Sequence, residues 1–312
     1  MIKKTTEDLL EIVSDLKIDS SLDDSFDGAY NIREDCRSIA RRSTENIKIE
    51  SKADGTGIDI IIKPGTKGEK AYIPACITQS NVDDLVYNDF IVGENADVTI
   101  IAGCGVHSDT GELSRHNGIH RFFLGAGAKV LYVEKHVGTG KRIADRQINP
   151  VTEIYLDHGA VIEMDTLQLG GVTYSDRKTT AVMNSESKLL IRERILTDSD
   201  EQAKSSFDMD IRGEDATVSL VSRSVAKGHS YQAYYSNITG NARCSGHSEC
   251  DGILVGGGRI SATPSLVANT PDAALIHEAA IGKIAGEQIL KLRTLGLTEE
   301  EAEAAIINGF LR

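Results

Sequence analysis

Tryptophan is absent from the sequence, and proline and aromatic residues are scarce. The 312 residues include no Trp, 5 Pro and 5% aromatic residues in total. A large enzyme that grips sugars or nucleobases generally needs more aromatic platforms on which rings can stack. The composition therefore counts against this class of enzyme. A hydrophobic content of 40% still allows a sizeable core, in one large elongated domain or in two ordinary ones.

Concentrated positive charge and long apolar runs are also missing. The formal net charge is -13, and basic pairs such as Arg41-Arg42 and Lys141-Arg142 are scattered. Because phosphate binding needs clustered Lys and Arg, no nucleic-acid partner is expected. No apolar run approaches the roughly 20 residues that cross a bilayer. The N-terminal stretch MIKKTTEDLLEIVSDLKID lacks a signal-peptide core. We therefore expect a cytoplasmic protein with no membrane partner.

Cysteines are few, odd in number and widely spaced. The five are Cys36, Cys76, Cys104, Cys244 and Cys250. This distribution excludes a disulfide framework. We expect each thiol to be a buried filler, a metal ligand or a reactive group.

Glycine is abundant, with 29 residues, and short units built around turns recur through the middle of the chain. Each unit has a Gly, Asp or Asn turn, a small residue, and then an apolar alternation of period two. The small residues are Ala96, Ala128, Ala160, Ser187 and Ala216, separated by 32, 32, 27 and 29 residues. One such unit cannot bury its inner face alone, so neighbours must stack.

This pattern predicts an all-β core over residues 46–276, folded as a right-handed parallel β-helix or related β-solenoid. Helical repeats would show a period of 3.6 residues, and a propeller blade needs about 40 residues. An irregular β-sandwich with fortuitous spacing is the alternative.

The two ends of the sequence differ from the repeat. Residues 1–45 form a predicted N-terminal segment, with a helix over 5–17 followed by an irregular, charged stretch. Residues 277–312 form a predicted helical segment, with helices over 278–294 and 298–308. Thr298 and Glu301 have the spacing of a capping box, and Gly309 suits a helix end. Such a helix pair can cap the solenoid or bind a partner.

The stretch CSGHSEC, residues 244–250, has the Cys-x2-His-x2-Cys spacing of a metal site. On a β-strand, however, successive side chains alternate between faces. Cys244 and Cys250 then share one face, and His247 points to the other. A self-contained site of these three residues is therefore not expected.

A second group of potential ligands falls within GCGVHSDTGELSRHNGIH, residues 103–120. It contains Cys104-x2-His107 and His116-x3-His120, a spacing that resembles a zinc-type set. The intervening SDTGEL could form a loop that lets the four converge. A polar structural loop and a role in sulfur handling remain alternatives.

The C-terminal sequence HEAAIGKIAGEQILKLRTLGLTEEEAEAAIINGFLR, residues 277–312, resembles the signature of the SufB/SufD family of iron–sulfur cluster assembly proteins. ECDGILVG, residues 249–256, resembles the family strand that carries a Cys-Asp pair. The resemblance covers roughly residues 70–312. It implies a parallel β-helix, a dimer of such subunits, and an ABC-type ATPase docked on the C-terminal helices. No Walker A motif is present, so ATP hydrolysis would belong to that partner.

The resemblance implies that Cys250, His277 and Glu278 serve as cluster ligands or persulfide acceptor, with Cys244 as a further candidate thiol. The cofactor implied is a transient iron–sulfur cluster, with [4Fe-4S] favoured, built with a sulfur donor and passed to apo-proteins. Such a scaffold is not an enzyme. Because the chain is short and resembles the B-type subunit, we expect it to form a homodimer, or a heterodimer with a paralogue.

The repeat spacing supports a pairing of Cys250 with Glu278. Glu278 lies 28 residues later, which is one repeat, so the two would lie on adjacent turns and share a face with a stagger of two residues. Two copies in a symmetric dimer would supply about four ligands.

Two rival functions remain. Many parallel β-helices are polysaccharide lyases or hydrolases, in which carboxylates flank a sugar groove, and Glu163 and Asp165 are candidates here. A metal-binding or purely structural solenoid is the other alternative.

Overall fold

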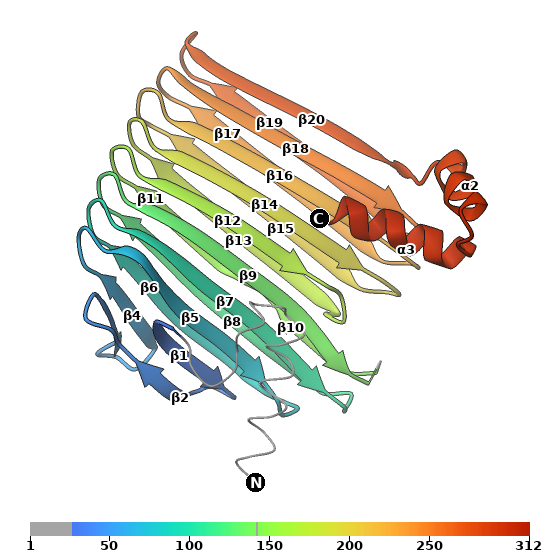
Figure 1. Ribbon diagram of the computed structural model, residues 1–312, viewed down its shortest axis with the longest axis horizontal. Helices are drawn as coiled ribbons and strands as arrows, with labels where there is room; N and C mark the ends of the chain where they lie inside the picture. The colour runs from blue at the N-terminus through green and yellow to red at the C-terminus, as the bar shows by residue number, and fades with distance from the viewer. Residues whose placement is uncertain (1–26, 142) are drawn as a thin grey trace.

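A computed structural model describes residues 27–141 and 143–312, which form a parallel β-solenoid of about eight turns (Figure 1). The predicted helix over residues 5–17 lies outside the described residues. Each regular turn contributes one strand to each of two sheets that enclose the core. The predicted β-solenoid is confirmed.

Sheet A contains ten strands. In spatial order they are β2 (Arg37–Arg42), β1 (Ala29–Glu34), β5 (Lys67–Ile77), β7 (Asp97–Ser108), β9 (Lys129–Gly140), β12 (Val161–Gln168), β14 (Lys188–Thr197), β16 (Thr217–Ala226), β18 (Cys244–Leu254) and β20 (Ala273–Lys283). All neighbours pair in parallel except β1 and β2, which form an antiparallel hairpin.

Sheet B lies opposite sheet A. Its strands are β19 (Arg259–Ala268), β17 (Tyr231–Gly240), β15 (Gln202–Ile211), β13 (Tyr174–Met183), β10 (Asp145–Ile148), β11 (Val151–Leu156), β8 (Leu113–Leu124), β6 (Asp83–Val92), β4 (Gly57–Ile62) and β3 (Ile47–Ser51). β10 and β11 both lie between β8 and β13, interrupted at Pro150, which lacks a backbone donor. β3 and β4 pair antiparallel, and the other pairings are parallel.

The small residues of the repeat mark the corners at which the chain turns into sheet A. All five are fully buried: Ala96, Ala128, Ala160, Ser187 and Ala216. The residue before each one has a positive φ, with Gly127 and Gly159 at two of these positions. Left-handed backbone is easiest for Gly, which explains the glycine content of the turns. A larger side chain at the corner would meet the turns above and below.

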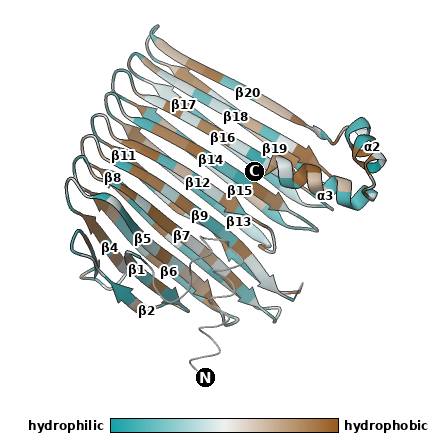
Figure 2. Ribbon diagram, viewed as in Figure 1, coloured by the Kyte–Doolittle hydropathy of each residue, from teal (hydrophilic) through white to brown (hydrophobic). Residues whose placement is uncertain are grey.

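Alternation along the strands divides the molecule into an inside and an outside. In Figure 2, hydrophobic and hydrophilic bands alternate along most strands. The inward positions form one continuous apolar core, and a smaller cluster contains Cys104. Several inward positions nevertheless carry charged or polar side chains, which the apolar alternation of the sequence does not predict.

The segment 1–45 is more regular than predicted in the part that is described. Residues 29–42 form the β1–β2 hairpin, which turns at Asp35 and Cys36 with positive φ at both. β2 is an edge strand and exposes most of its side chains to water, so its arginines hide the alternation by which a strand is recognised in the sequence.

The C-terminal boundary also lies later than predicted. Residues 277–283 continue β20, and the first helix, α2, spans Gly286–Thr294. Eleven residues of β20 pair with β18, and this pairing outweighs the helical spacing of the apolar residues. The second helix, α3 (Glu299–Phe310), has the predicted capping box at Thr298 and continues one residue past Gly309.

Helix α3 folds back on the outer face of sheet A (Figure 1). Ala302 and Ile307 are its buried side chains. Arg223 of β16 donates to the Phe310 carbonyl at 3.2 Å, and Arg194 of β14 donates to the Leu311 carbonyl at 3.3 Å. Helix α2, in contrast, buries no residue. Neither helix is long and apolar enough to cross a bilayer, and no other described segment is a membrane-spanning helix.

Candidate functional site

Strand β18 separates the residues of the CSGHSEC stretch as expected from strand alternation. Cys244 and Cys250 point inward and are 7% and 0% exposed. His247 and Glu249 lie on the outer face. The spacing therefore does not make a Cys-His-Cys metal site.

The pairing of β18 with β20 corrects the predicted partnership of Cys250 and Glu278. Glu249 is opposite Glu278, whereas Cys250 is opposite Ala279. Glu278 therefore lies on the outer face and Cys250 on the inner face. The expectation that Cys250 and Glu278 share a face requires Arg243 at the position of the small residue in this turn, whereas Cys244 is the residue that pairs with Ala273. A shift of one residue reverses the face of every side chain.

His277 is the predicted ligand that shares the inner face with Cys250. It lies opposite Ser248, diagonal to Cys250, and is only half-buried because the solenoid ends at β20. Its Nδ1–H donates to the Ser248 carbonyl at 3.1 Å. The thiol and this imidazole therefore lie on the same inner face of the last turn.

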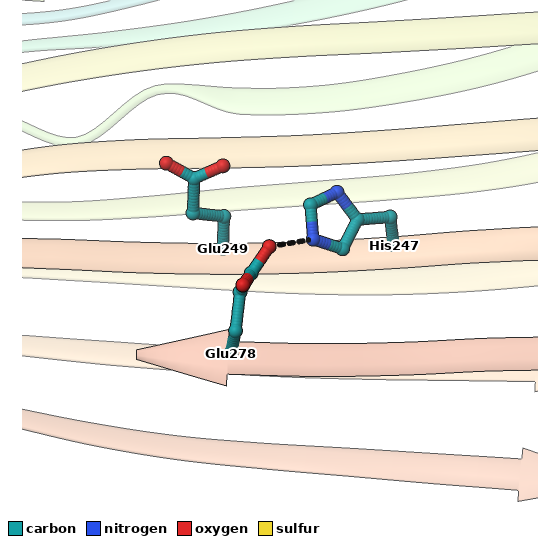
Figure 3. Close-up of side chains that lie close together, drawn as sticks. All are labelled: His247, Glu249 and Glu278. Carbon is teal, nitrogen blue, oxygen red and sulfur yellow. Dashed lines mark hydrogen bonds and ion pairs between the residues drawn. The ribbon is translucent and has the colours of Figure 1, made fainter. Parts of the chain in front are cut away.

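The outer face brings together three side chains, which Figure 3 shows in close-up. His247 Nε2 donates to Glu278 Oε1 at 2.7 Å, and Glu249 lies beside them on β18. One ligand atom from each residue lies within 4.8 Å of the others, and no other such group of three occurs in residues 27–141 and 143–312. Partial burial raises the pKa of Glu249, and the neighbouring carboxylates of Asp251 and Glu278 raise it further.

The Cys250 thiol lies in an unusual inner environment. Burial raises its pKa to about 12, and the carboxylates of Glu193 and Asp251 contribute to the shift. Ser222 of β16 is its neighbour on the adjacent turn. The Ser222 hydroxyl donates to Glu193 Oε2 at 3.0 Å. Cys250 is thus protonated at neutral pH and lies next to the end of a buried polar network.

That network continues toward the middle of the solenoid through paired charges. Arg177 lies 2.8 Å from Glu134 Oε2 and 3.5 Å from Glu193 Oε1. Glu134 also accepts a hydrogen bond from the Tyr132 hydroxyl at 2.9 Å. Burial is the largest single influence on the pKa of Glu134 and would raise it. The Arg177 guanidinium and the rings of His136 and His120 together outweigh burial and hold this pKa well below its usual range. Each of these buried charges has a partner, as burial in a low-dielectric interior requires.

The four residues of the second predicted ligand group do not form one site. Cys104 is buried in an apolar cluster of β7, and His107 points outward to Thr139 at 3.0 Å. His116 lies inside, with Nδ1 2.9 Å from Asp84, and His120 contacts the Tyr132 hydroxyl at 3.2 Å. Strand alternation separates His107 from the others, and each histidine already has a protein partner. The zinc-type interpretation is therefore wrong.

The carboxylates proposed for polysaccharide cleavage are also engaged. Glu163 pairs with Arg192 at 3.5 Å, and Asp165 pairs with Arg194, the arginine that holds the end of α3. Both carboxylates face outward on β12, and each is already neutralised by an arginine of the next strand of sheet A.

Sequence reasoning missed Glu249, Glu193 and Ser222. A signal existed for the first two. Glu249 lies two residues from His247 on the same face of β18, and Glu193 interrupts the inward apolar series of Leu189, Ile191 and Ile195 on β14. No pattern distinguished Ser222 from any other small polar residue of a strand.

Comparison with known proteins identifies one family that covers most of the chain. The family model of the SUF system FeS cluster assembly, SufBD core domain, matches residues 78–310. An iron–sulfur cluster assembly SufBD family protein of Archaeoglobus fulgidus is 31% identical over 88% of this chain and 73% of its own length. A relative from Methanothermobacter thermautotrophicus is 30% identical over 84% of this chain and 64% of its own length.

A third relative, from Methanocaldococcus jannaschii, has nearly the same length as this chain. It is 27% identical over 98% of both sequences. The match therefore includes the repeat, the last turn and the C-terminal helices together. On this basis, the chain belongs to the SufBD family of iron–sulfur cluster assembly proteins.

Proposed function

We propose that this protein is a cytoplasmic scaffold on which sulfur and iron are assembled into a cluster at the last turn of the solenoid. It would accept sulfur from a donor protein and pass the finished cluster to apo-proteins, with no turnover chemistry of its own. The observation that carries the proposal is that Cys250 and His277 share the inner face of two paired strands at one end of the molecule, with Glu278 next to His277 on the outer face. Thiolate, imidazole and carboxylate ligands together suit iron.

The open end of the solenoid supports a dimer. Strands β19 and β20 are the last strands of their sheets, and no described strand pairs with their outer edges. Ile276 is 61% exposed there, and Leu266 and Val267 are also exposed. Long, unprotected strand edges attract another chain. A second copy, or a paralogue, seated on this end would bring a second set of the three candidate ligands toward the first.

The buried thiol explains why such a scaffold would need a partner. With a pKa of about 12 and no exposed surface, Cys250 is neither ionised nor reachable in the isolated chain. A cysteine must lose its proton to bind iron or to attack sulfur. Loading therefore requires the last turn to open or iron to displace the proton.

The C-terminal helices connect directly to that turn. Strand β20, which carries His277 and Glu278, ends at Lys283, three residues before α2 begins. Helix α2 buries no residue and exposes Leu290, and Leu295 directly after it is also exposed. An ABC-type ATPase bound to this surface could therefore pull on β20, and ATP hydrolysis would belong to that partner. Copurification from the native cell should yield this ATPase together with iron.

Anaerobic reconstitution with ferrous iron and sulfide tests the role of the thiol. We expect the Cys250→Ala protein to lose most of the visible cluster absorbance of the wild type, because an essential thiolate is missing. Cys36→Ala is the matched control, since Cys36 is the exposed cysteine and the other four are buried. Undiminished absorbance in Cys250→Ala would refute the assigned role.

A further inference from the structure

We propose that the outer face of the last turn binds one divalent transition-metal cation through His247, Glu249 and Glu278. This site is separate from the Cys250 thiol, which lies on the opposite face of β18. Naming the cation as ferrous iron rests on the proposed function. The existence of the site rests on its own geometry.

The strand pairing builds the site from fixed backbone positions. His247 and Glu249 are two residues apart on β18, so both side chains leave the same face. The register then places Glu278 of β20 directly opposite Glu249. The three side chains therefore converge without help from a loop, as Figure 3 shows.

The distances need little adjustment to hold a cation. The His247 Nε2 and Glu278 Oε1 atoms are 2.7 Å apart, and the candidate atom of Glu249 lies within 4.8 Å of both. Metal–ligand bonds of about 2.1 Å place neighbouring ligand atoms about 3 Å apart. Binding would require the Glu249 side chain to rotate toward the other two, which would complete one face of a coordination sphere.

The local charge favours a cation over a simple ion pair. The carboxylates of Asp251 and Glu278 lie near that of Glu249, and the imidazole of His247 beside them pairs with Glu278. Four arginines line the same cavity of about 330 Å³ as Glu249. Arg192 and Arg194 already pair with Glu163 and Asp165, and Arg223 donates to the end of α3. Neither Arg223 nor Arg312 forms an ion pair with Glu249. A simple His247–Glu278 ion pair does not account for the second carboxylate, Glu249, beside it.

The donor set selects a class of metal. One imidazole nitrogen with carboxylate oxygens and no sulfur suits Fe²⁺, Mn²⁺, Co²⁺ or Zn²⁺, and not the softer Cu⁺. Because His247 and Glu278 are partly exposed, water would fill the remaining positions and the cation would exchange readily. Such a site would hold iron on the outer face of β18, the strand that carries Cys250, before the iron enters a cluster.

Manganese is the best probe, because Mn²⁺ prefers oxygen and nitrogen ligands to thiols. Titration of the full chain with MnCl₂, followed by electron paramagnetic resonance of free Mn²⁺, should show one bound cation per chain. Glu249→Gln and Glu278→Gln, each close in shape to the native residue, should each weaken binding at least tenfold. Circular dichroism verifies that the variants fold.

Two control variants separate this inference from the proposed function. His158→Gln removes the histidine of another exposed pair, His158–Glu186, and should leave Mn²⁺ binding unchanged. Cys250→Ser should also leave Mn²⁺ binding unchanged while abolishing cluster formation. Absence of stoichiometric Mn²⁺ binding by the wild type, or binding as tight as the wild type in both glutamine variants, overturns the site. Intact Mn²⁺ binding in a protein whose cluster does not depend on Cys250 would instead overturn only the proposed function.

Discussion

His120 is held inside the solenoid in its neutral form. Its Nδ1 lies 3.2 Å from the Tyr132 hydroxyl, which itself donates to Glu134. With a proton on Nδ1, His120 donates to the Tyr132 hydroxyl, and that hydroxyl donates to the Glu134 carboxylate, so all three groups are hydrogen-bonded. Burial lowers the pKa of His120 to about 4 and also lowers the pKa of His136, which lies next to Glu134.

The free energy of unfolding should therefore fall as the pH falls from about 6.5 toward 4. The unfolded chain takes up a proton on His120 near pH 6.5, whereas the folded chain resists it until about pH 4. The full effect of this one group is about 3 kcal/mol. Urea unfolding across this range measures it.

The pH slope should be smaller in His120→Gln than in the wild type. His158→Gln, which changes an exposed histidine, should keep the wild-type slope. Equal slopes in all three proteins would show that His120 is not the responsible group.

Single residues also show where sequence reasoning succeeded and where it failed at the site. The alternation that turns His247 away from Cys250 follows from the period of a strand, and it was predictable. The relative faces of Cys250 and Glu278 were not, because the face of Cys250 depends on whether Arg243 or Cys244 occupies the corner of its turn. Both readings fit the repeat length, and only the backbone pairing of Cys244 with Ala273 distinguishes them.

At the scale of elements, α3 is held by its first turn and by its last carbonyls. Thr298 accepts a hydrogen bond from the Glu301 backbone, and the Glu301 carboxylate accepts one from the Thr298 backbone. At the other end, two arginines of sheet A bind the final carbonyl groups. The helix therefore depends on local contacts and on the sheet.

Thr298→Ala should destabilise α3 by about 1 kcal/mol, because one of the amides at its start loses its partner. Hydrogen exchange of the α3 amides should become several-fold faster, and exchange in the inner strands should not change. Thr294→Ala removes a hydroxyl that bonds only to the Lys291 carbonyl and serves as the control. Uniform acceleration throughout the molecule would contradict this local role.

The elements also differ in how well the sequence predicts them. The capping box of α3 is a local signal and needs no tertiary information. The end of β20 has no such signal, because HEAAIGK has the apolar spacing of a helix. Its eleven backbone pairings with β18 keep it extended, and a partner strand so distant in sequence cannot be read from local spacing.

At the scale of the whole molecule, the period of about 30 residues is the strongest feature of the sequence. It predicts the stacking of turns, because one turn alone exposes its inner face. It does not predict the buried charges of Glu134, Arg177 and Glu193, which break the apolar alternation. Removing Arg177 alone would leave two buried carboxylates without their shared cation.

The open end makes oligomeric state a test of the proposed dimer. Ile276→Lys places a charge on the last strand, where lysine opposes pairing between strand edges. We expect light scattering to show a molar mass reduced by half relative to the wild type. Leu85→Lys, on an exposed position of sheet B, should leave the mass unchanged. A wild-type monomer would contradict the dimer, as would an Ile276→Lys protein that remains dimeric.

The two hairpins β1–β2 and β3–β4 make the ends of the solenoid unequal. At the first described turn, each sheet reverses direction and finishes in a strand of only six or five residues, and β2 carries three arginines. At the last turn, the edge strands are ten and eleven residues long. A stack of parallel turns with two equal ends would polymerise into a fibre by adding head to tail. Because only one end of the described solenoid has long free edges, the proposed assembly would stop after two copies have joined.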